Sequence, residues 1–252
     1  MGKFISNFET TAELATFSAT TEFGRPHVSL TKDNSEIHFF KDPCSSEKVK
    51  TTYEWVEIGG VKWATKNVGA LTVTDYGQYF SWGGVNGFTA DQVSGTCHSK
   101  EFSWTDYELG NGGSSAADMT KYNSTDGKTV LESSDDAATV NMGSGWRMPT
   151  EADFNALTAA TTNAWVTNYG GSGVAGRLFT DKTDSSKVLF FPAAGSCYNG
   201  SVDGVGSYGY YWSSSLNASN VINGRELYFD SGNCSMNNFS RYSGYSVRGV
   251  VG

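Results

Sequence analysis

Hydrophobic and polar residues alternate in short runs along most of this chain, a pattern typical of β-strands. The stretch "WVEIGGVKWATKNVG" alternates on both sides of Gly59-Gly60 and predicts a pair of strands. The continuous apolar run in "KVLFFPAAG" predicts a buried strand that ends at Pro192. "GYYWSSS", "RELYF" and "YSVRGVV" predict the closing strands, joined by connections rich in Asn, Ser and Gly. We therefore expect a domain built mainly of short strands.

Helical spacing is rare, and its clearest example lies in "SGWRMPTEADFNALTAA". Thr150 is the expected N-cap, and Asp153 three residues later completes an approximate capping box. Phe154, Leu157 and Ala160 then follow at helical intervals. A second short helical turn is expected at "TTAELATF" near the N-terminus. One or two helices among many short strands, with long polar loops over about residues 84 to 130, predict an α+β fold.

The texture of the chain divides it into two parts. Residues 1–52 contain "HVSL" and "EIHFF", which flank the polar "TKDNS" and predict a hairpin with a five-residue loop. The following "KDPCSSEKVKTT" is typical of a linker. So small a segment buries little core by itself, so we expect it to serve attachment or oligomerisation. Residues 53–252 form the expected main domain.

Charge and hydropathy argue against several classes of partner. The chain has 18 basic and 26 acidic residues, a net charge of −8, and its basic residues are scattered. This argues against nucleic acid and against an anionic membrane surface as partners. No apolar run approaches the length of a membrane span, so no membrane insertion is expected. The N-terminal residues lack the pattern of a signal peptide.

Residues that could bind metal are few and dispersed. The four cysteines are widely spaced without a CxxC motif, which favours free thiols. The three histidines are too far apart in sequence to indicate a zinc site. Asp135 and Asp136 are adjacent carboxylates that fit either a hard cation or a helix cap, and we favour the cap. No metal or cofactor is expected.

The C-terminal part of the chain has an unusual composition. From Ser207 to Gly244 there are nine Ser, six Asn, five Tyr and four Gly, which make 24 of 38 residues. These types are enriched in antibody paratopes, where Tyr supplies rigid contact area and the small residues supply adaptable hydrogen bonds. The charges of the segment cancel to zero. A neutral surface rich in aromatic and hydrogen-bonding groups suits recognition.

Alternation within "RELYFDSGN" separates scaffold from surface. Leu227 and Phe229 are expected to face the core, whereas Glu226, Tyr228 and Asp230 are expected to face outward. Asn and Ser could simply fill loops, but aromatic and small polar residues alternate through the predicted strands as well. Met236 and Tyr242 are assigned to the scaffold. With the polar loop positions added, the candidate ligand-binding residues are Asn217, Asn220, Asn223, Glu226, Tyr228, Asp230, Asn233, Ser235, Asn237, Asn238, Phe239, Ser240 and Ser243.

Six motifs occur in order over residues 53–252: "KWATKNVGA", "DYGQYFSWG", "SGWRMPTEADF", "FFPAAG", "GSYGYYWSSS" and "RYSGYSVRGV". Together they resemble the Fibrobacter succinogenes major paralogous domain, a member of the C-type lectin fold superfamily. That superfamily also holds formylglycine-generating enzymes and the variable proteins of diversity-generating retroelements, such as a phage major tropism determinant. The resemblance implies a C-type lectin (formylglycine-generating-enzyme-like) fold with a variable region at about residues 207–246. These retroelements substitute at template adenines, which turns Asn codons into codons for Ser, Tyr, Asp, Gly or Phe.

The function implied by this resemblance is ligand or receptor binding through a hypervariable surface. The expected partner is a protein or glycan receptor on a bacterial surface. The expected location is a virion tail or the extracellular cell surface. Single sites of this kind are often weak, and repeated copies, as in a homo-oligomer such as a trimer, would add avidity.

Two alternatives belong to other classes. The first is a fixed carbohydrate-binding or adhesin module of a bacterial surface protein, with no diversification. Calcium-dependent sugar binding is disfavoured, because the Glu-Pro-Asn or Gln-Pro-Asp triplet and the Trp-Asn-Asp of calcium-dependent lectins are absent. The second is an oxidase that uses Cys197 and Cys234, but these cysteines lack the expected surroundings and all histidines are distant in sequence. We therefore expect no catalytic residues. The family resemblance implies that the motif containing Arg147 and Glu151 is a folding element, with Trp146 in the core.

Overall fold

The computed structural model describes the backbone of residues 27–30 and 37–40 and all of residues 52–252. The chain divides into two compact units, Met1–Glu47 and Lys48–Gly252. In the first unit, strands β1 (His27–Leu30) and β2 (Ile37–Phe40) pair antiparallel, which confirms the predicted hairpin. Its loop, the helical turn expected at "TTAELATF" and the segment from residue 41 to residue 51 lie outside the described residues.

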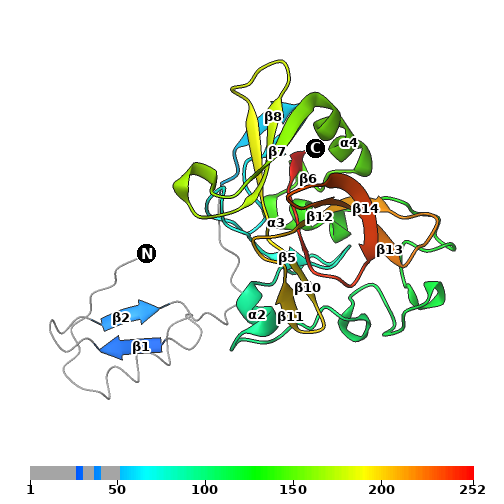
Figure 1. Cartoon of the computed structure of the whole chain (residues 1–252). Coiled ribbons are helices and arrows are strands. Elements are labelled where there is room, and N and C mark those ends of the chain that lie inside the picture. The colour runs from blue at the N-terminus through cyan, green and yellow to red at the C-terminus, as the bar shows by residue number, and fades with distance from the viewer. Residues whose placement is uncertain (1–26, 31–36, 41–51) are drawn as a thin grey trace. The chain divides into compact units, whose positions relative to one another are not determined.

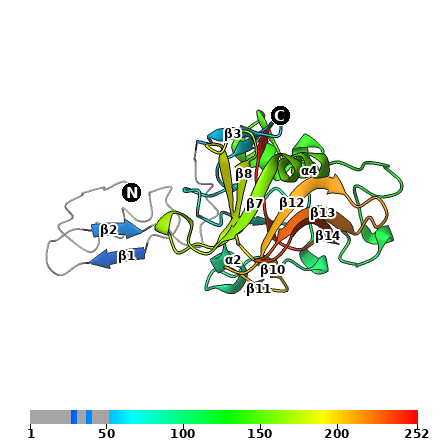
Figure 2. The same ribbon diagram turned by 45° about the horizontal axis from the view of Figure 1, so that its top comes forward.

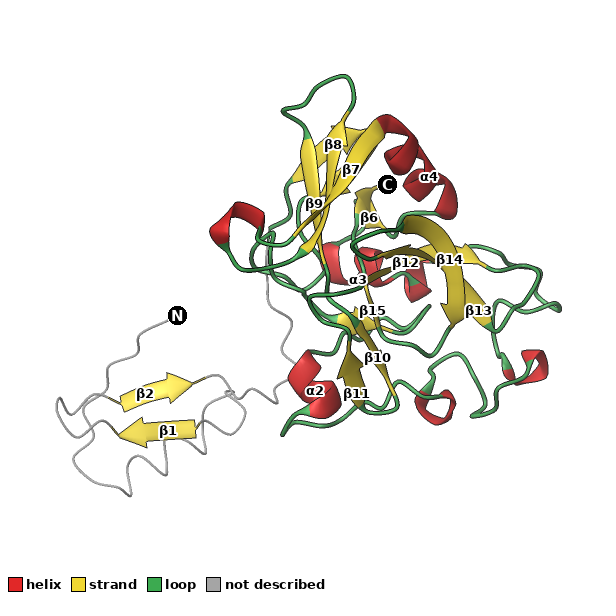
Figure 3. Ribbon diagram, viewed as in Figure 1, coloured by secondary structure: helices red, strands yellow, loops and turns green. Residues whose placement is uncertain are grey.

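The second unit is a mixed α+β structure in which short strands and long loops predominate (Figures 1 and 3). Its strands are β3 (Trp55–Ile58), β4 (Val61–Ala64), β5 (Tyr79–Phe80), β6 (Trp146–Arg147), β7 (Thr161–Val166), β8 (Gly176–Asp181), β9 (Val188–Pro192), β10 (Ser196–Tyr198), β11 (Ser201–Asp203), β12 (Gly209–Leu216), β13 (Asn223–Phe229), β14 (Cys234–Ser240), β15 (Tyr245–Ser246) and β16 (Val250–Val251). Its helices are α2 (Ala90–Ser94), α3 (Ala137–Met142) and α4 (Glu151–Ala160). Single 3-10 turns cover Trp104–Asp106, Ala116–Asp118, Ser133–Asp135 and Tyr169–Gly171.

The central sheet has the strand order β14-β13-β12-β15-β5. Figure 2 shows β12, β13 and β14 side by side, and these strands pair antiparallel, whereas β12 and β15 are parallel. Strands β13 and β14 stay in register along their whole length, with Asn223 opposite Ser240 and Phe229 opposite Cys234. Because side chains alternate along a strand, residues paired across this ladder lie on the same face of the sheet.

Three smaller sheets complete the unit. One has the order β7-β8-β9, a second has the order β3-β4-β16-β6, and the third pairs β10 with β11. In the second, Val250 pairs with Trp63 on one side and Arg147 on the other, so the C-terminal strand lies beside a strand from the start of the unit. The strand pair around Gly59-Gly60 and the buried strand that ends at Pro192 are both confirmed.

The helix caps agree with the sequence. Helix α4 begins after Thr150, whose hydroxyl accepts from the Asp153 backbone N–H in a capping box, as predicted. Helix α3 begins after Asp136, whose carboxylate accepts from the Thr139 N–H at 2.8 Å, which confirms the cap interpretation. Helix α2 was not predicted, because its five residues are too short to show a periodic pattern.

Two buried clusters cover opposite faces of the central sheet. Tyr211 and Trp212 are successive residues of β12, so they point to opposite faces, and both are fully buried. The Tyr211 cluster contains Phe154, Leu157, Phe179, Phe191, Leu227 and Phe229. The Trp212 cluster contains Phe80, Trp82, Tyr122, Met148, Tyr245 and Val247.

The expectations for Trp146 and for the cysteines are wrong. Trp146 was expected in the core, but it is only half-buried and packs edge-on against Tyr53, because the short strand β6 lies at the edge of its sheet. Free thiols were expected at every cysteine, but Cys97 is disulfide-bonded. Cys197 and Cys234 are free.

Candidate ligand-binding surface

Strand β13 sends its side chains alternately to the two faces of the central sheet. Leu227 and Phe229 are fully buried, which confirms their assignment to the core. Tyr228 points to the other face and is half-buried. It pairs with Ser235 on β14, so Ser235, Asn237 and Phe239 share its face, and all three are exposed. Four of the predicted residues therefore lie together on one side of β13 and β14.

Two tyrosines extend this face: Tyr210 in strand β12 and Tyr208 immediately before it. The ring centroids of Tyr208, Tyr210 and Tyr228 lie 5.3 to 6.3 Å apart. Tyr208 is 41% exposed and Phe239 is 48% exposed. We call this surface the aromatic face; it consists of Tyr208, Tyr210, Tyr228, Ser235, Asn237 and Phe239. Tyr208 and Tyr210 were not among the predicted residues, although the alternation in "SYGYYW" would have placed them opposite Tyr211.

Asp230 closes the end of the aromatic face. The Tyr228 hydroxyl donates to its carboxylate at 2.7 Å, and the backbone N–H groups of Gly232 and Asn233 donate at 2.7 Å each. These hydrogen bonds, with the Tyr228 bond the largest contribution, hold the pKa of Asp230 well below its usual range. Asp230 is therefore an ionised group beside Tyr228, and the exposed Asn233 lies in the same turn.

Glu226 is not an outward-facing residue, and the prediction is wrong for it. The alternation places Glu226 on the side of Tyr228. On that side, Tyr245 of β15 stacks on Trp212, with ring centroids 4.4 Å apart, and the two rings cover this part of the sheet. Glu226 is 1% exposed, and its Oε2 atom has no hydrogen-bond partner. Burial raises the pKa of this carboxyl to about 8, and a hydrogen bond from Tyr245 opposes the rise.

Ser243 was expected at an exposed loop position, but it is also buried, at 1% exposure, so this expectation is wrong. It lies in the turn after β14, where its carbonyl accepts from the Trp212 indole N–H at 3.2 Å. The neighbouring Arg241 donates hydrogen bonds to the carbonyls of Val221 and Tyr122 at 3.0 and 3.2 Å. These bonds hold the turn against the loops that contain Val221 and Tyr122.

The remaining predicted residues form a second group away from the aromatic face. Asn223, Asn238 and Ser240 belong to the side of β13 and β14 that carries Leu227 and Met236. The Asn238 side-chain oxygen accepts from Asn217 at 3.0 Å and from Asn223 at 2.8 Å. The exposed Asn220 lies in the turn between β12 and β13. The structure therefore divides the predicted set: four residues lie on the aromatic face, and a second group lies around the hydrogen-bonded amides of Asn217, Asn223 and Asn238. Asp230 and Asn233 lie in the turn at the end of the face, and Glu226 and Ser243 are buried.

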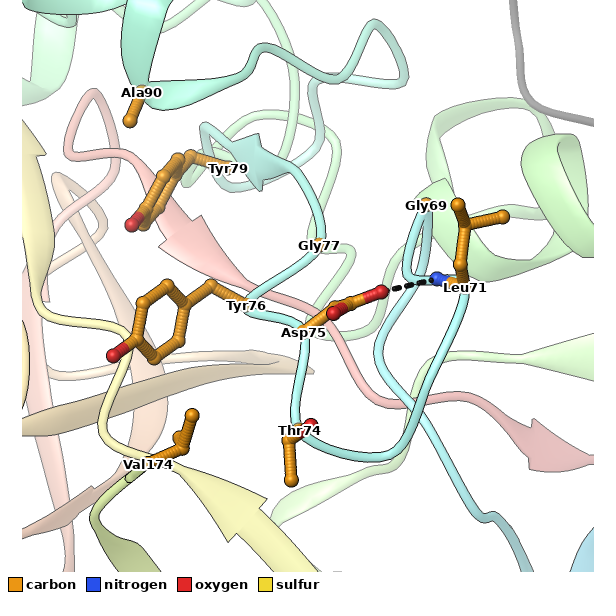
Figure 4. A pocket seen from close by; sticks show the side chains of 9 residues that line it. All are labelled: Gly69, Leu71, Thr74, Asp75, Tyr76, Gly77, Tyr79, Ala90 and Val174. Carbon is orange, nitrogen blue, oxygen red and sulfur yellow. Dashed lines mark hydrogen bonds between the residues drawn. The ribbon is translucent and has the colours of Figure 1, made fainter. Parts of the chain in front are cut away.

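A separate open cavity of about 440 Å³ lies beside the loop between β4 and β5 (Figure 4). The Asp75 carboxylate there accepts hydrogen bonds from the backbone N–H groups of Leu71 and Thr72 at 2.9 and 2.8 Å. These bonds stabilise the conformation of the loop. None of the predicted residues lines it. Its lining residues are Gly69, Leu71, Thr74, Asp75, Tyr76, Gly77, Tyr79, Ala90 and Val174.

The two free thiols are held in their protonated form. Burial raises the pKa of Cys197 well above its usual value and that of Cys234 to about 11. Within residues 52–252, no three His, Cys, Asp or Glu side chains come together as a metal site. The described residues also include no helix that is long and apolar enough to cross a membrane.

Comparison with protein families gives one match over part of the chain. Residues 174–250 match the model of a domain of unknown function (DUF8237). This stretch begins just before β8 and contains β12, β13 and β14, so the matched region includes the whole aromatic face. Comparisons with curated proteins and with solved structures found no match.

Proposed function

We propose that this protein is a ligand-binding protein with a C-type lectin fold, whose aromatic face is diversified by a retroelement. The expected partner is a protein or glycan receptor on a bacterial surface, met from a virion tail or from a cell surface. Residues 1–52 would attach the domain or assemble it into an oligomer such as a trimer, whose repeated copies would add avidity.

One observation carries the proposal. The aromatic face gathers the exposed Tyr208 and Phe239, two half-buried tyrosines and small polar side chains on and beside the paired strands β12, β13 and β14. Tyr and Phe provide rigid contact area at low entropic cost, and Ser and Asn provide adaptable hydrogen bonds. Because these side chains leave the sheet on the side opposite Leu227 and Phe229, they can vary while the core beneath stays the same.

The six motifs that carry the family resemblance also support the proposal. Each contributes at least one side chain that is 1% exposed or less, so the motifs behave as a common scaffold. Examples, one from each motif in chain order, are Trp63, Trp82, Met148, Phe191, Trp212 and Arg248.

The binding role can be tested with the intact chain on a panel of bacterial cells. Tyr208→Ser combined with Phe239→Ser removes two exposed rings of the aromatic face. Trp55→Ser is the matched control, because Trp55 is 49% exposed but lies on β3. We expect fluorescently labelled protein to bind some cells, and the double variant to lose this binding while the control retains it. Equal binding by all three proteins would place the ligand site elsewhere.

A further inference from the structure

Two carboxylates lie at the aromatic face without a basic partner. In the part of the chain that the structure describes, neither Glu226 nor Asp230 forms an ion pair with Lys or Arg. Arg225 points to the opposite side of the sheet and meets Glu151 at 3.3 Å. Arg177 donates to the backbone carbonyl of Asp230 at 3.1 Å, not to its carboxylate. Among the described residues, no basic side chain therefore compensates the charge of Asp230, or that of Glu226 when it is ionised.

The buried carboxylate is an independent indication of a ligand. A buried polar atom normally has a hydrogen-bond partner, yet the Glu226 Oε2 atom has none. Glu226 is 1% exposed, and the register of β12 and β13 places it on the same side of the sheet as Tyr210 and Tyr228. Tyr210 stacks on Tyr245 there, with ring centroids 4.9 Å apart. A carboxylate in such a low-dielectric position attracts a nearby cation more strongly than a carboxylate in water does.

The tyrosine rings provide the other half of a cation site. The faces of aromatic rings are negative, and ammonium and guanidinium groups bind over them within about 6 Å of the centroid. The rings of Tyr208 and Tyr210 are inclined by 46°, and those of Tyr210 and Tyr228 by 49°. The third pair, Tyr208 and Tyr228, is inclined by only 24°. Because the Tyr210 ring is tilted against both of the others, the three rings do not form one flat platform, which suits a compact cation better than a flat sugar ring.

We propose that the aromatic face binds a basic side chain of a protein partner, an Arg or Lys held between the three tyrosine rings and the carboxylates of Asp230 and Glu226. This inference rests on the proposed function and names the chemistry of its ligand. It also favours a protein over a neutral glycan among the expected receptors. The net charge of −8 on the chain would steer a basic partner toward it.

The site should respond to pH in a defined direction. Below a pH of about 8 the carboxyl of Glu226 is protonated and neutral, and above it the group is ionised. The titratable side chains that face it are Tyr210 on β12 and Tyr245 on β15, and burial keeps both phenols neutral in this range. Asn237, its neighbour on β14, does not titrate, and Asp230 stays ionised. Cation binding should therefore strengthen as pH rises from 6 to 9.

The experiment uses the full chain with isotope-labelled tyrosine rings, followed by NMR during titration. The probes are a blocked Gly-Arg-Gly tripeptide, a blocked Gly-Glu-Gly tripeptide and the neutral trisaccharide maltotriose. Arg keeps its charge throughout this pH range, so any pH effect belongs to the protein. We expect only the Arg peptide to shift the signals of Tyr208, Tyr210 and Tyr228, with an affinity that rises with pH. The rise should be absent in Glu226→Gln.

Asp230→Asn and Asp184→Asn form a matched pair of variants. The carboxylates of both residues accept hydrogen bonds within turns. Asp184 accepts hydrogen bonds from the backbone N–H and the hydroxyl of Ser186 in the loop between β8 and β9. Each variant removes one charge and keeps a side-chain oxygen, so both should fold. We expect Asp230→Asn to lower the affinity for the Arg peptide about fivefold, because a charge-assisted contact is lost. Asp184→Asn should leave this affinity unchanged.

Three results would overturn the cation preference. They are equal shifts with the Glu peptide or maltotriose, equal effects of the two Asp variants, and no response of the tyrosine rings to any probe. Each result leaves the proposed function to be judged separately by cell binding, where the double variant Tyr208→Ser with Phe239→Ser is compared with Trp55→Ser. A face that loses cell binding on substitution but prefers a neutral or acidic probe would still be a ligand site.

Discussion

The guanidinium of Arg248 donates two hydrogen bonds to the side-chain oxygen of Asn67, at 3.0 and 2.7 Å. The two residues are 181 positions apart in sequence, and both are fully buried. Arg248 also donates to the carbonyls of Ala64 and Phe190 at 3.0 Å each, and it lies over the Phe191 ring. One side chain thus joins the first strands of the domain, the β9 strand and the C-terminus.

Replacing Arg248 should therefore destabilise the domain strongly. Arg248→Met leaves the acceptors of Asn67, Ala64 and Phe190 buried without donors, and we expect a loss of about 3 kcal/mol or more in the free energy of unfolding. Urea unfolding measures it. Arg225→Met is the control, because Arg225 is half-exposed and its pair with Glu151 at 3.3 Å should contribute less than about 1 kcal/mol. Equal losses would contradict the anchoring role.

Gly224 marks a position in β13 that cannot accept a side chain. A Cβ atom there would lie 2.5 Å from Cδ1 of the buried Trp82. We expect Gly224→Ala to cost about 1–3 kcal/mol, because the tightly packed indole cannot move away. Gly232→Ala is the control: it lies in the turn before β14, and its added Cβ meets nothing closer than 3.6 Å. Thermal unfolding of the two variants should separate them clearly, and similar melting temperatures would contradict the packing seen here.

The two sides of the β13–β14 ladder should differ in their tolerance of substitution. Phe239→Ser changes a residue that is 48% exposed, and we expect a change in stability of about 0.5 kcal/mol or less. Leu227→Ala changes a fully buried residue, and we expect a loss of about 2–5 kcal/mol. Urea unfolding of both variants compares the two sides directly. A large loss for Phe239→Ser would mean that the aromatic face is part of the scaffold.

The buried carboxyl of Glu226 should make stability depend on pH. Its pKa is raised from 4.5 to about 8, so between these values the folded state binds more protons than the unfolded state. The free energy of unfolding should therefore fall as pH rises, by at most about 1.4 kcal/mol per pH unit from this group. Unfolding curves from pH 5 to pH 9 should show this slope in the native chain. The slope should be smaller in Glu226→Gln and unchanged in Glu151→Gln, and equal slopes in all three would contradict the buried position.

The sequence predicted the local structure well where local chemistry decides it. The capping box at Thr150 and the buried strand before Pro192 both follow from patterns within a few residues. The alternation that buries Leu227 and exposes Phe239 is equally local. The α+β class follows from the same short patterns.

The errors arose from contacts between distant segments. Alternation placed Glu226 on the correct side of the sheet, but it could not show that Tyr245 and Trp212 close that side. Ser243 was misassigned for the same reason, because its turn packs on Trp212. Tyr208 and Tyr210 were not included in the predicted set, although the period-two pattern of β12 places them beside Tyr228. A candidate site can be located from the sequence, but its exposed members become known only when the sheet is assembled.

The most direct test of a diversified aromatic face is deep sequencing of the DNA for residues 205–252 across a population that carries the gene. We predict that substitutions concentrate at the codons of Tyr228, Asn233, Ser235, Asn237 and Phe239. The codons of Gly224, Leu227 and Arg248 should stay fixed, because the first has no room for a side chain and the others are fully buried. If the exposed codons are as invariant as the buried ones, the face is not diversified, and a fixed adhesin would take the place of the proposed function.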